Sequence, residues 1–293
     1  MSENDVLCVE SDFSSYTVTH IIAGGKEVGG VTSLGDDVFV VRHHSQEKIE
    51  AYDANTFTLQ RHITVPGLGN YCYGLAACAY NNCLYASDFV NDSVHRVDLS
   101  GSNAVMKWSV ASGPRCLSVN SEHNLLIVCG GGEPKLQIIT DHGTVQHEHN
   151  IQLQADIEYP RHAVQLSTGQ FLLSHSLHHV CLVEVDGVVG AVVRSYGEQK
   201  GTMRLSEPSG LAVDGEGRVL VANWGNNRLL VIDQSLSSAR DMSVGLCVEG
   251  GLKGPFSLWY DQSRSRLYIG EWGVDHEGRV IVITICKASV HNE

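Results

Sequence analysis

A pattern of three short apolar runs separated by polar turns recurs along almost the whole chain. Its clearest copy spans Leu205–Asp233, where Gly215-Glu216-Gly217 and Asn223–Asn227 lie between the runs. Strand-length segments rich in β-branched and aliphatic residues, bounded by Gly, Asn and Asp, predict a meander of antiparallel strands. This copy therefore predicts three consecutive strands joined by tight turns.

The recurrence of this pattern constrains the fold more than any single copy does. Copies begin near residues 30, 74, 116, 162, 210 and 257. Their spacing of roughly 42–48 residues is typical of propeller blades or solenoids. The gap after each copy can hold a fourth strand, such as Arg240–Gly245. We therefore predict an all-β, six-bladed β-propeller of four-stranded antiparallel blades, with residues 1–293 forming one domain.

The N-terminal segment Tyr16–Ile22 has strand character but precedes the first complete copy. We expect it to pair with Arg279–Ile285, the last run of the final copy, so that an N-terminal strand closes the ring. Such pairing would protect an edge strand from aggregation. The alternative is that the polar tail Ala288–Asn292 takes this place.

Three segments of the clearest copy carry a family resemblance: Gly210–Asp214 (GLAVD), Val219–Asn223 (VLVAN) and Gly225–Leu229 (GNNRL). They resemble the NHL repeat, and Asn227-Arg228-Leu229 stands where the family has Asn-His-Leu. The resemblance implies a six-bladed propeller and a connection with tripartite-motif ubiquitin ligases, whose C-terminal propellers select substrates or RNA. It would make this chain an isolated propeller or a piece of a longer protein, with any ligase activity belonging elsewhere.

Charge and cysteine content limit the classes of partner. The formal net charge of −13 disfavours general attraction to DNA or to an anionic membrane. The acidic N-terminus lacks a signal-peptide core, and no apolar run approaches the ~20 residues of a membrane span. The nine cysteines contain no Cys-x-x-Cys pair, which argues against a structural zinc site. We expect a cytoplasmic protein with reduced thiols and no cofactor.

In an antiparallel blade, the loop before the innermost strand and the loop between the second and third strands share one face. On this loop face we expect a partner-binding surface. Its candidate residues are Tyr73, Arg115, Arg161, Phe256, Trp224, Trp272 and Asn223. Aromatic and arginine side chains suit a protein interface, and this is our main hypothesis. Single-stranded RNA is the alternative partner, because rings stack on bases and guanidinium groups hold phosphates.

A metal-dependent propeller hydrolase or lyase is the third hypothesis. The 15 histidines include several in loops that would face each other across the pore. His43, His175, Glu271 and Asp88 would be the metal ligands in this case. The chain contains no Gly-x-Ser-x-Gly and no His-Glu-x-x-His motif. The sequence thus favours a non-catalytic interaction scaffold and leaves the enzyme as an alternative.

Overall fold

The computed structural model describes residues 16–22, 24–141, 146–154, 156–167, 169–175, 178–197, 203–273 and 277–285. This part of the chain is built of β-strands, with two three-residue 3₁₀ helices, η1 (Trp224–Asn226) and η2 (Ser243–Gly245). Neither helix is long enough to cross a membrane. The predicted all-β class with four-stranded antiparallel units is confirmed.

Four of the sheets contain four strands each. The first is formed by β2 (Val28–Leu34), β3 (Asp37–Arg42), β4 (Lys48–Asp53) and β5 (Leu59–Thr64). The second is formed by β6 (Leu75–Cys78), β7 (Cys83–Asp88), β8 (Ser93–Asp98) and β9 (Val105–Ser109). A third is formed by β18 (Pro208–Val213), β19 (Val219–Asn223), β20 (Arg228–Ile232) and β21 (Ala239–Asp241). The strand β21 starts earlier and is shorter than predicted, because residues 243–245 form η2.

The fourth of these sheets joins the two ends of the described chain. It is formed by β22 (Pro255–Asp261), β23 (Arg266–Glu271), β24 (Val280–Ile285) and β1 (Tyr16–Ile22). The strand β1 pairs antiparallel with β24, from Tyr16 opposite Ile285 to Ile22 opposite Val280. The predicted closure by an N-terminal strand is confirmed. The alternative strand, Ala288–Asn292, lies outside the described residues.

The remaining sheet has eight strands and differs from the prediction. One half is formed by β10 (Pro114–Val119), β11 (Leu125–Cys129), β12 (Lys135–Asp141) and β13 (Gln146–Leu153). The other is formed by β14 (Pro160–Ser167), β15 (Gln170–His175), β16 (His179–Asp186) and β17 (Val189–Tyr196). Parallel pairing of Gln152 with Val189 and of Leu153 with Gly190 joins the halves at their outermost strands. Six separate sheets were predicted, and the structure has this joined pair in place of two of them.

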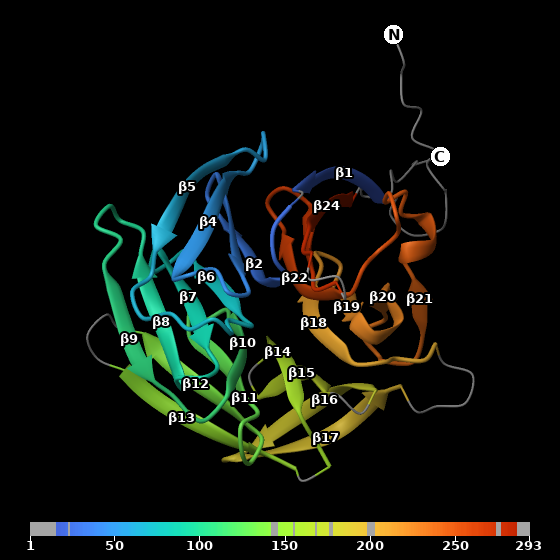
Figure 1. Cartoon of the computed structure of the whole chain (residues 1–293). Helices are drawn as coiled ribbons and strands as arrows, with labels where there is room; N and C mark the ends of the chain where they lie inside the picture. Colours follow the sequence, from blue (N-terminus) through green and yellow to red (C-terminus); the bar gives the residue numbers. More distant parts are fainter. Residues whose placement is uncertain are drawn as a thin grey trace, which may run out of the picture.

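The first strand of each four-stranded unit lies toward a common centre, around which the units follow in chain order (Figure 1). These strands contact one another in the closed sequence β2, β6, β10, β14, β18, β22 and back to β2. Glycines permit the close approach. A Cβ atom on Gly74 would lie 2.8 Å from the Leu117 nitrogen, and one on Gly210 would lie 2.8 Å from the Leu258 nitrogen. A side chain here would push neighbouring units apart.

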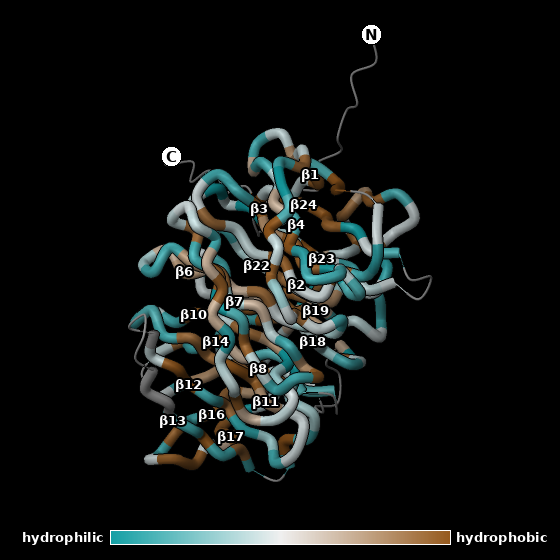
Figure 2. Tube along the Cα trace, turned by 60° about the vertical axis from the view of Figure 1, so that its left-hand side comes forward, coloured by the Kyte–Doolittle hydropathy of each residue, from teal (hydrophilic) through white to brown (hydrophobic). Residues whose placement is uncertain are grey.

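The hydrophobic core consists of clusters that each lie between successive four-stranded units. One cluster joins Phe39 and Ile49 of the first sheet to Leu84 of the second. Another joins Leu136 and Leu173, so the halves of the eight-stranded sheet also pack face to face. Hydrophobic residues accordingly follow the strands, and hydrophilic residues gather in the connecting loops (Figure 2). Because the strands supply the hydrophobic core, residues in the connecting loops are available for a binding site.

Candidate functional site

Four of the predicted binding residues meet at one end of the axis. Tyr73 lies in the loop two residues before β6, and Arg115, Arg161 and Phe256 are the second residues of β10, β14 and β22. They line one small cavity of about 20 Å³ together with Ser209 of β18. We call this the mouth cavity. Side chains from five units therefore converge on the face that the sequence predicts.

Aromatic side chains form a continuous cluster beside the mouth cavity. Trp272 stacks on Tyr73 with ring centroids 5.5 Å apart, and Phe256 lies 4.8 Å from Trp272. Tyr73 also contacts Phe89 at 5.3 Å. The remaining members, His43, His44 and Tyr71, join through further ring contacts. We refer to these seven residues, of which Tyr71 is 40% exposed, as the aromatic surface.

Tyr71 and Phe89 belong to this surface although they are not among the binding residues predicted from the sequence. Phe89 directly follows Asp88 at the end of β7, just as Trp272 follows Glu271 at the end of β23. This equivalent position in the repeat is the sequence signal by which Phe89 can be identified. Tyr71 has a weaker signal, because only its place in the loop that carries Tyr73 distinguishes it from other surface tyrosines.

Trp224 lies apart from the aromatic surface. Its indole Nε1 donates a hydrogen bond to the Trp272 carbonyl at 3.1 Å. It lines a separate cavity of about 440 Å³ between the last two units, together with Glu207, Lys253 and Glu277. Trp224 and Trp272 thus lie in neighbouring loops, and of these two residues Trp272 joins the ring contacts at the mouth.

The two arginines at the mouth differ in their pairing. Arg161 Nη2 donates to Glu207 Oε2 at 3.1 Å, and the Glu207 side chain is 42% exposed. The Arg115 guanidinium instead lies over the Phe89 ring, 5.2 Å from its centroid. Burial, and then the neighbouring charge of Arg161, lower the pKa of Arg115. Within the described part of the chain, Arg115 forms no ion pair, so the mouth carries a positive charge that is not neutralised.

Asn223 does not belong to the binding surface, because its side chain is fully buried. Its Oδ1 accepts the Ser206 backbone N–H at 2.7 Å, and its Nδ2 donates to the Arg204 carbonyl at 3.2 Å. The amide therefore anchors the loop that enters β18. The burial and the two hydrogen bonds of Asn223 favour an anchoring role over the partner contact predicted from the sequence.

Two proposed metal ligands perform the same anchoring role at the matching position of other units. Asp88 Oδ2 accepts the Gly69 N–H at 3.0 Å, and Glu271 Oε1 accepts the Lys253 N–H at 2.7 Å. Glu271 also pairs with Arg279, whose Nε donates to Oε2 at 2.6 Å. Both carboxylates are almost completely buried and engaged with the protein itself. Both carboxylates therefore bind backbone N–H groups of neighbouring loops and are not exposed to an open metal site.

The two proposed histidine ligands also lie in separate places. His43 packs against Trp272, with ring centroids 3.7 Å apart, whereas His175 stacks on His179 at 5.0 Å. Burial lowers the pKa of each to about 4. In the described ranges, no group of three or more His, Cys, Asp or Glu side chains could hold a metal ion. The geometry therefore gives no support to the metal-site alternative.

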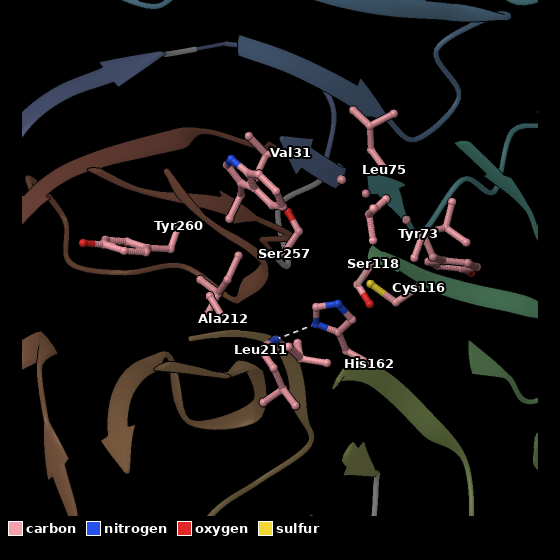
Figure 3. Close-up of a pocket in the computed structure, with 18 of the residues that line it drawn as sticks. Val31, Tyr73, Leu75, Cys116, Ser118, His162, Leu211, Ala212, Ser257 and Tyr260 are labelled. Atoms are coloured by element: carbon pink, nitrogen blue, oxygen red, sulfur yellow. Dashed lines mark hydrogen bonds between the residues drawn. The ribbon is translucent and has the colours of Figure 1, made fainter. Parts of the chain in front are cut away.

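A larger cavity of about 160 Å³ continues along the axis next to the mouth cavity. We call it the axial cavity, and the two share Tyr73, Cys116, His162 and Ser257. His162 projects from β14 into this region, and its Nδ1 accepts the Leu211 N–H at 2.7 Å (Figure 3). Burial lowers the pKa of His162 to about 4, although the Leu117 backbone acts in the opposite direction. The ring is therefore neutral at physiological pH.

Comparisons with known proteins agree with this architecture. The NHL repeat model matches residues 205–232. The fold is similar to a streptogramin B lyase, with 13% identity, a TM-score of 0.62 and coverage of 92% of this chain and 86% of that chain. It is also similar to virginiamycin B lyase from Staphylococcus aureus, with 12% identity, a TM-score of 0.62 and coverage of 92% and 89%. The WD40 β-propeller domain of Doa1 has 11% identity, a TM-score of 0.64 and coverage of 92% and 97%.

At these identities the similar structures establish a β-propeller fold and nothing further. No curated protein sequence matches the chain significantly. Neither the repeat match nor the similar structures support the expected connection with tripartite-motif ubiquitin ligases.

Proposed function

We propose that this chain is a non-catalytic interaction module that binds a protein partner through its aromatic surface. The observation that carries the proposal is the convergence of Tyr73, Phe256 and Trp272 beside Arg115 at the mouth of the axis. Aromatic and arginine side chains contribute most of the binding free energy in many protein interfaces. NHL-like and WD40-like propellers generally mediate protein interactions, which supports this assignment.

We also propose that the molecule is a six-bladed NHL propeller. This count treats each half of the eight-stranded sheet as a blade, because β10 and β14 occupy separate positions in the closed circle of first strands. A cytoplasmic location is part of the proposal. It is supported by the free cysteines of the described chain, since disulfides are rare in that compartment.

A protein partner suits the surface better than single-stranded RNA does. The Tyr73 and Trp272 rings stack on each other, so one face of each ring is already covered and cannot stack on a base. RNA binding usually needs a track of cationic side chains along several phosphates. Here Arg161 is paired with Glu207, and the chain has a net charge of −13. The one unneutralised charge of Arg115 fits a single acidic group more readily than a phosphate backbone.

The experiment selects binders from a random linear-peptide library with the whole chain as bait. The affinity of the selected peptides is then measured by calorimetry against Tyr71→Ser and Tyr80→Ser. Both tyrosines are exposed, but Tyr80 lies in the turn between β6 and β7, at the opposite end of β6. We expect Tyr71→Ser to weaken binding at least tenfold, about 1.4 kcal/mol, and Tyr80→Ser to leave it unchanged.

Two outcomes would contradict the proposal. Peptides that bind both variants with equal affinity would show that the aromatic surface is not the docking site. If no peptide is enriched but a single-stranded oligouridine binds with an affinity that falls steeply with salt, the RNA alternative replaces the protein partner.

A further inference from the structure

The mouth cavity is lined by residues whose buried nitrogen donors are poorly satisfied. Arg115 Nε, Arg161 Nε and His162 Nε2 are all buried and make no hydrogen bond of normal geometry, although the Leu117 backbone lies near enough to the His162 ring to raise its pKa. Buried polar atoms in native proteins almost always have a partner. The buried Nε atoms of Arg115 and Arg161, together with the weakly engaged His162 N–H, therefore favour an additional acceptor in this cavity.

The protonation of His162 identifies its free nitrogen as a donor. Because Nδ1 accepts the Leu211 N–H, the proton of the neutral ring resides on Nε2. The side chain is only 6% exposed. In Figure 3 the ring lies among Cys116, Ser118 and Leu211, with its second nitrogen turned away from Leu211. His162 thus presents a fixed N–H group at the junction of the mouth and axial cavities.

The charges at this junction favour an anionic acceptor. Among the described residues, Arg115 lacks an ion pair, and Arg161 pairs with the carboxylate of Glu207, whose side chain is 42% exposed. The mouth cavity has room for a group little larger than one water molecule. This space suits a planar carboxylate better than a tetrahedral phosphate.

The axial cavity indicates what the carboxylate is attached to. Most of its lining is apolar and includes Val31, Leu75, Val164 and Trp259. At about 160 Å³ it can hold a compact hydrocarbon group but not a large cofactor. Burial of such a group would supply hydrophobic free energy in addition to the hydrogen bonds.

We propose that the two cavities form one binding site for a carboxylate that carries a compact apolar group. The carboxylate lies in the mouth cavity against Arg115, Arg161 and His162, and the apolar group extends into the axial cavity. The ligand is either a free small monocarboxylic acid or the C-terminal residue of a peptide, since both present the same chemistry. Tyr71 lines neither the mouth cavity nor the axial cavity, so binding of this ligand should not depend on Tyr71.

The test measures binding of 4-methylpentanoate to the whole chain by calorimetry, with 4-methylpentanamide as the uncharged analogue. We expect saturable binding of the acid and at least tenfold weaker binding of the amide. Arg115→Gln should weaken acid binding at least tenfold. Arg61→Gln is the matched control, because Arg61 is an exposed, ion-paired arginine of β5, the strand at the edge of its sheet opposite β2. It should bind the acid as the wild type does.

His162 is tested separately, because His162→Phe also removes the acceptor of the Leu211 N–H and could impair folding. The nitrogen-15 resonance of Nε2 in the wild-type protein provides a second measurement that needs no substitution. We expect this resonance to shift in proportion to acid bound. An unchanged resonance at saturation would show that the acid binds elsewhere and would overturn the assignment.

The two sources are distinguished with a peptide that ends in leucine, with a free or an amidated C-terminus. Tighter binding of the free-carboxylate peptide than of 4-methylpentanoate assigns the site to a chain terminus, whereas binding of the small acid alone assigns it to a metabolite. Equal affinity for acid and amide, equal affinity of wild type and Arg115→Gln, or displacement by equimolar inorganic phosphate would overturn the proposal. Tyr71→Ser should bind the acid normally, so this test can fail or succeed independently of the proposed protein partner.

Discussion

Replacing Asn223 with alanine tests whether this residue anchors a loop or contacts a partner. The substitution removes the acceptor of the Ser206 N–H at 2.7 Å and the donor to the Arg204 carbonyl at 3.2 Å. Each lost hydrogen bond costs about 1 kcal/mol, and a buried N–H without a partner costs about 1–3 kcal/mol. We therefore expect the free energy of unfolding to fall by about 2–4 kcal/mol.

Urea unfolding followed by tryptophan fluorescence measures this loss, and Asn226→Ala is the matched control. Asn226 donates to the same Arg204 carbonyl at 3.0 Å, but it is exposed, so water can replace the bond. We expect Asn226→Ala to change the free energy of unfolding by less than about 0.5 kcal/mol. If Asn223→Ala is equally mild yet abolishes peptide binding, our reasoning is refuted and Asn223 returns to the binding surface.

Two further predictions concern buried titratable groups. Burial lowers the pKa of His43 and His175 to about 4, so the unfolded chain binds protons first as the pH falls. As the pH falls from about 6.5 to about 4, the free energy of unfolding should decrease by up to about 1.4 kcal/mol per pH unit for each histidine. Urea unfolding midpoints that do not change with pH in this window would contradict the lowered pKa values of the two histidines. Burial also raises the pKa of Cys72 and Cys181 to about 12, whereas Cys247 is exposed. Mass spectrometry after brief iodoacetamide treatment of the native protein should find Cys247 modified and the other two unmodified, and rapid labelling of Cys181 would be evidence against the packed arrangement.

The strand pattern was predictable because it depends on local chemistry. Alternating apolar residues and Gly, Asn and Asp turns mark each first strand, and β2, β6, β10, β14, β18 and β22 begin close to the predicted positions. The pairing of β1 with β24 also followed, because β1 precedes the first complete copy and the last copy ends with β24, which leaves the outer edge of β24 without a fourth strand of its own copy. The joining of β13 to β17 did not follow. It depends on two residue pairs between the outermost strands of neighbouring units. These strands can pair only if the angle between the two units brings their edges together, and the repeat pattern does not specify this angle.

The candidate site was predictable in its location but not in the role of each residue. Tyr73, Arg115, Arg161 and Phe256 converge because their positions relative to the first strands are fixed by the repeat. Asp88, Asn223 and Glu271 share a different fixed position, at the end of a second strand. A polar residue there is compatible with ligand binding or with anchoring of a backbone N–H. Only the path of the entering loop, which the repeat pattern does not specify, distinguishes the two.

The pairing of β1 with β24 has a consequence for how the protein folds during synthesis. The ribosome produces Tyr16–Ile22 long before Val280–Ile285, so β1 has no partner until β24 has been synthesised. Its unpaired edge is then available to other chains or to chaperones. The earlier sheets can form as they emerge, but the sheet that contains both strands is completed last. Completion of the ring therefore depends on a contact between strands that are far apart in the sequence, and such non-local contacts are intrinsically slow to form.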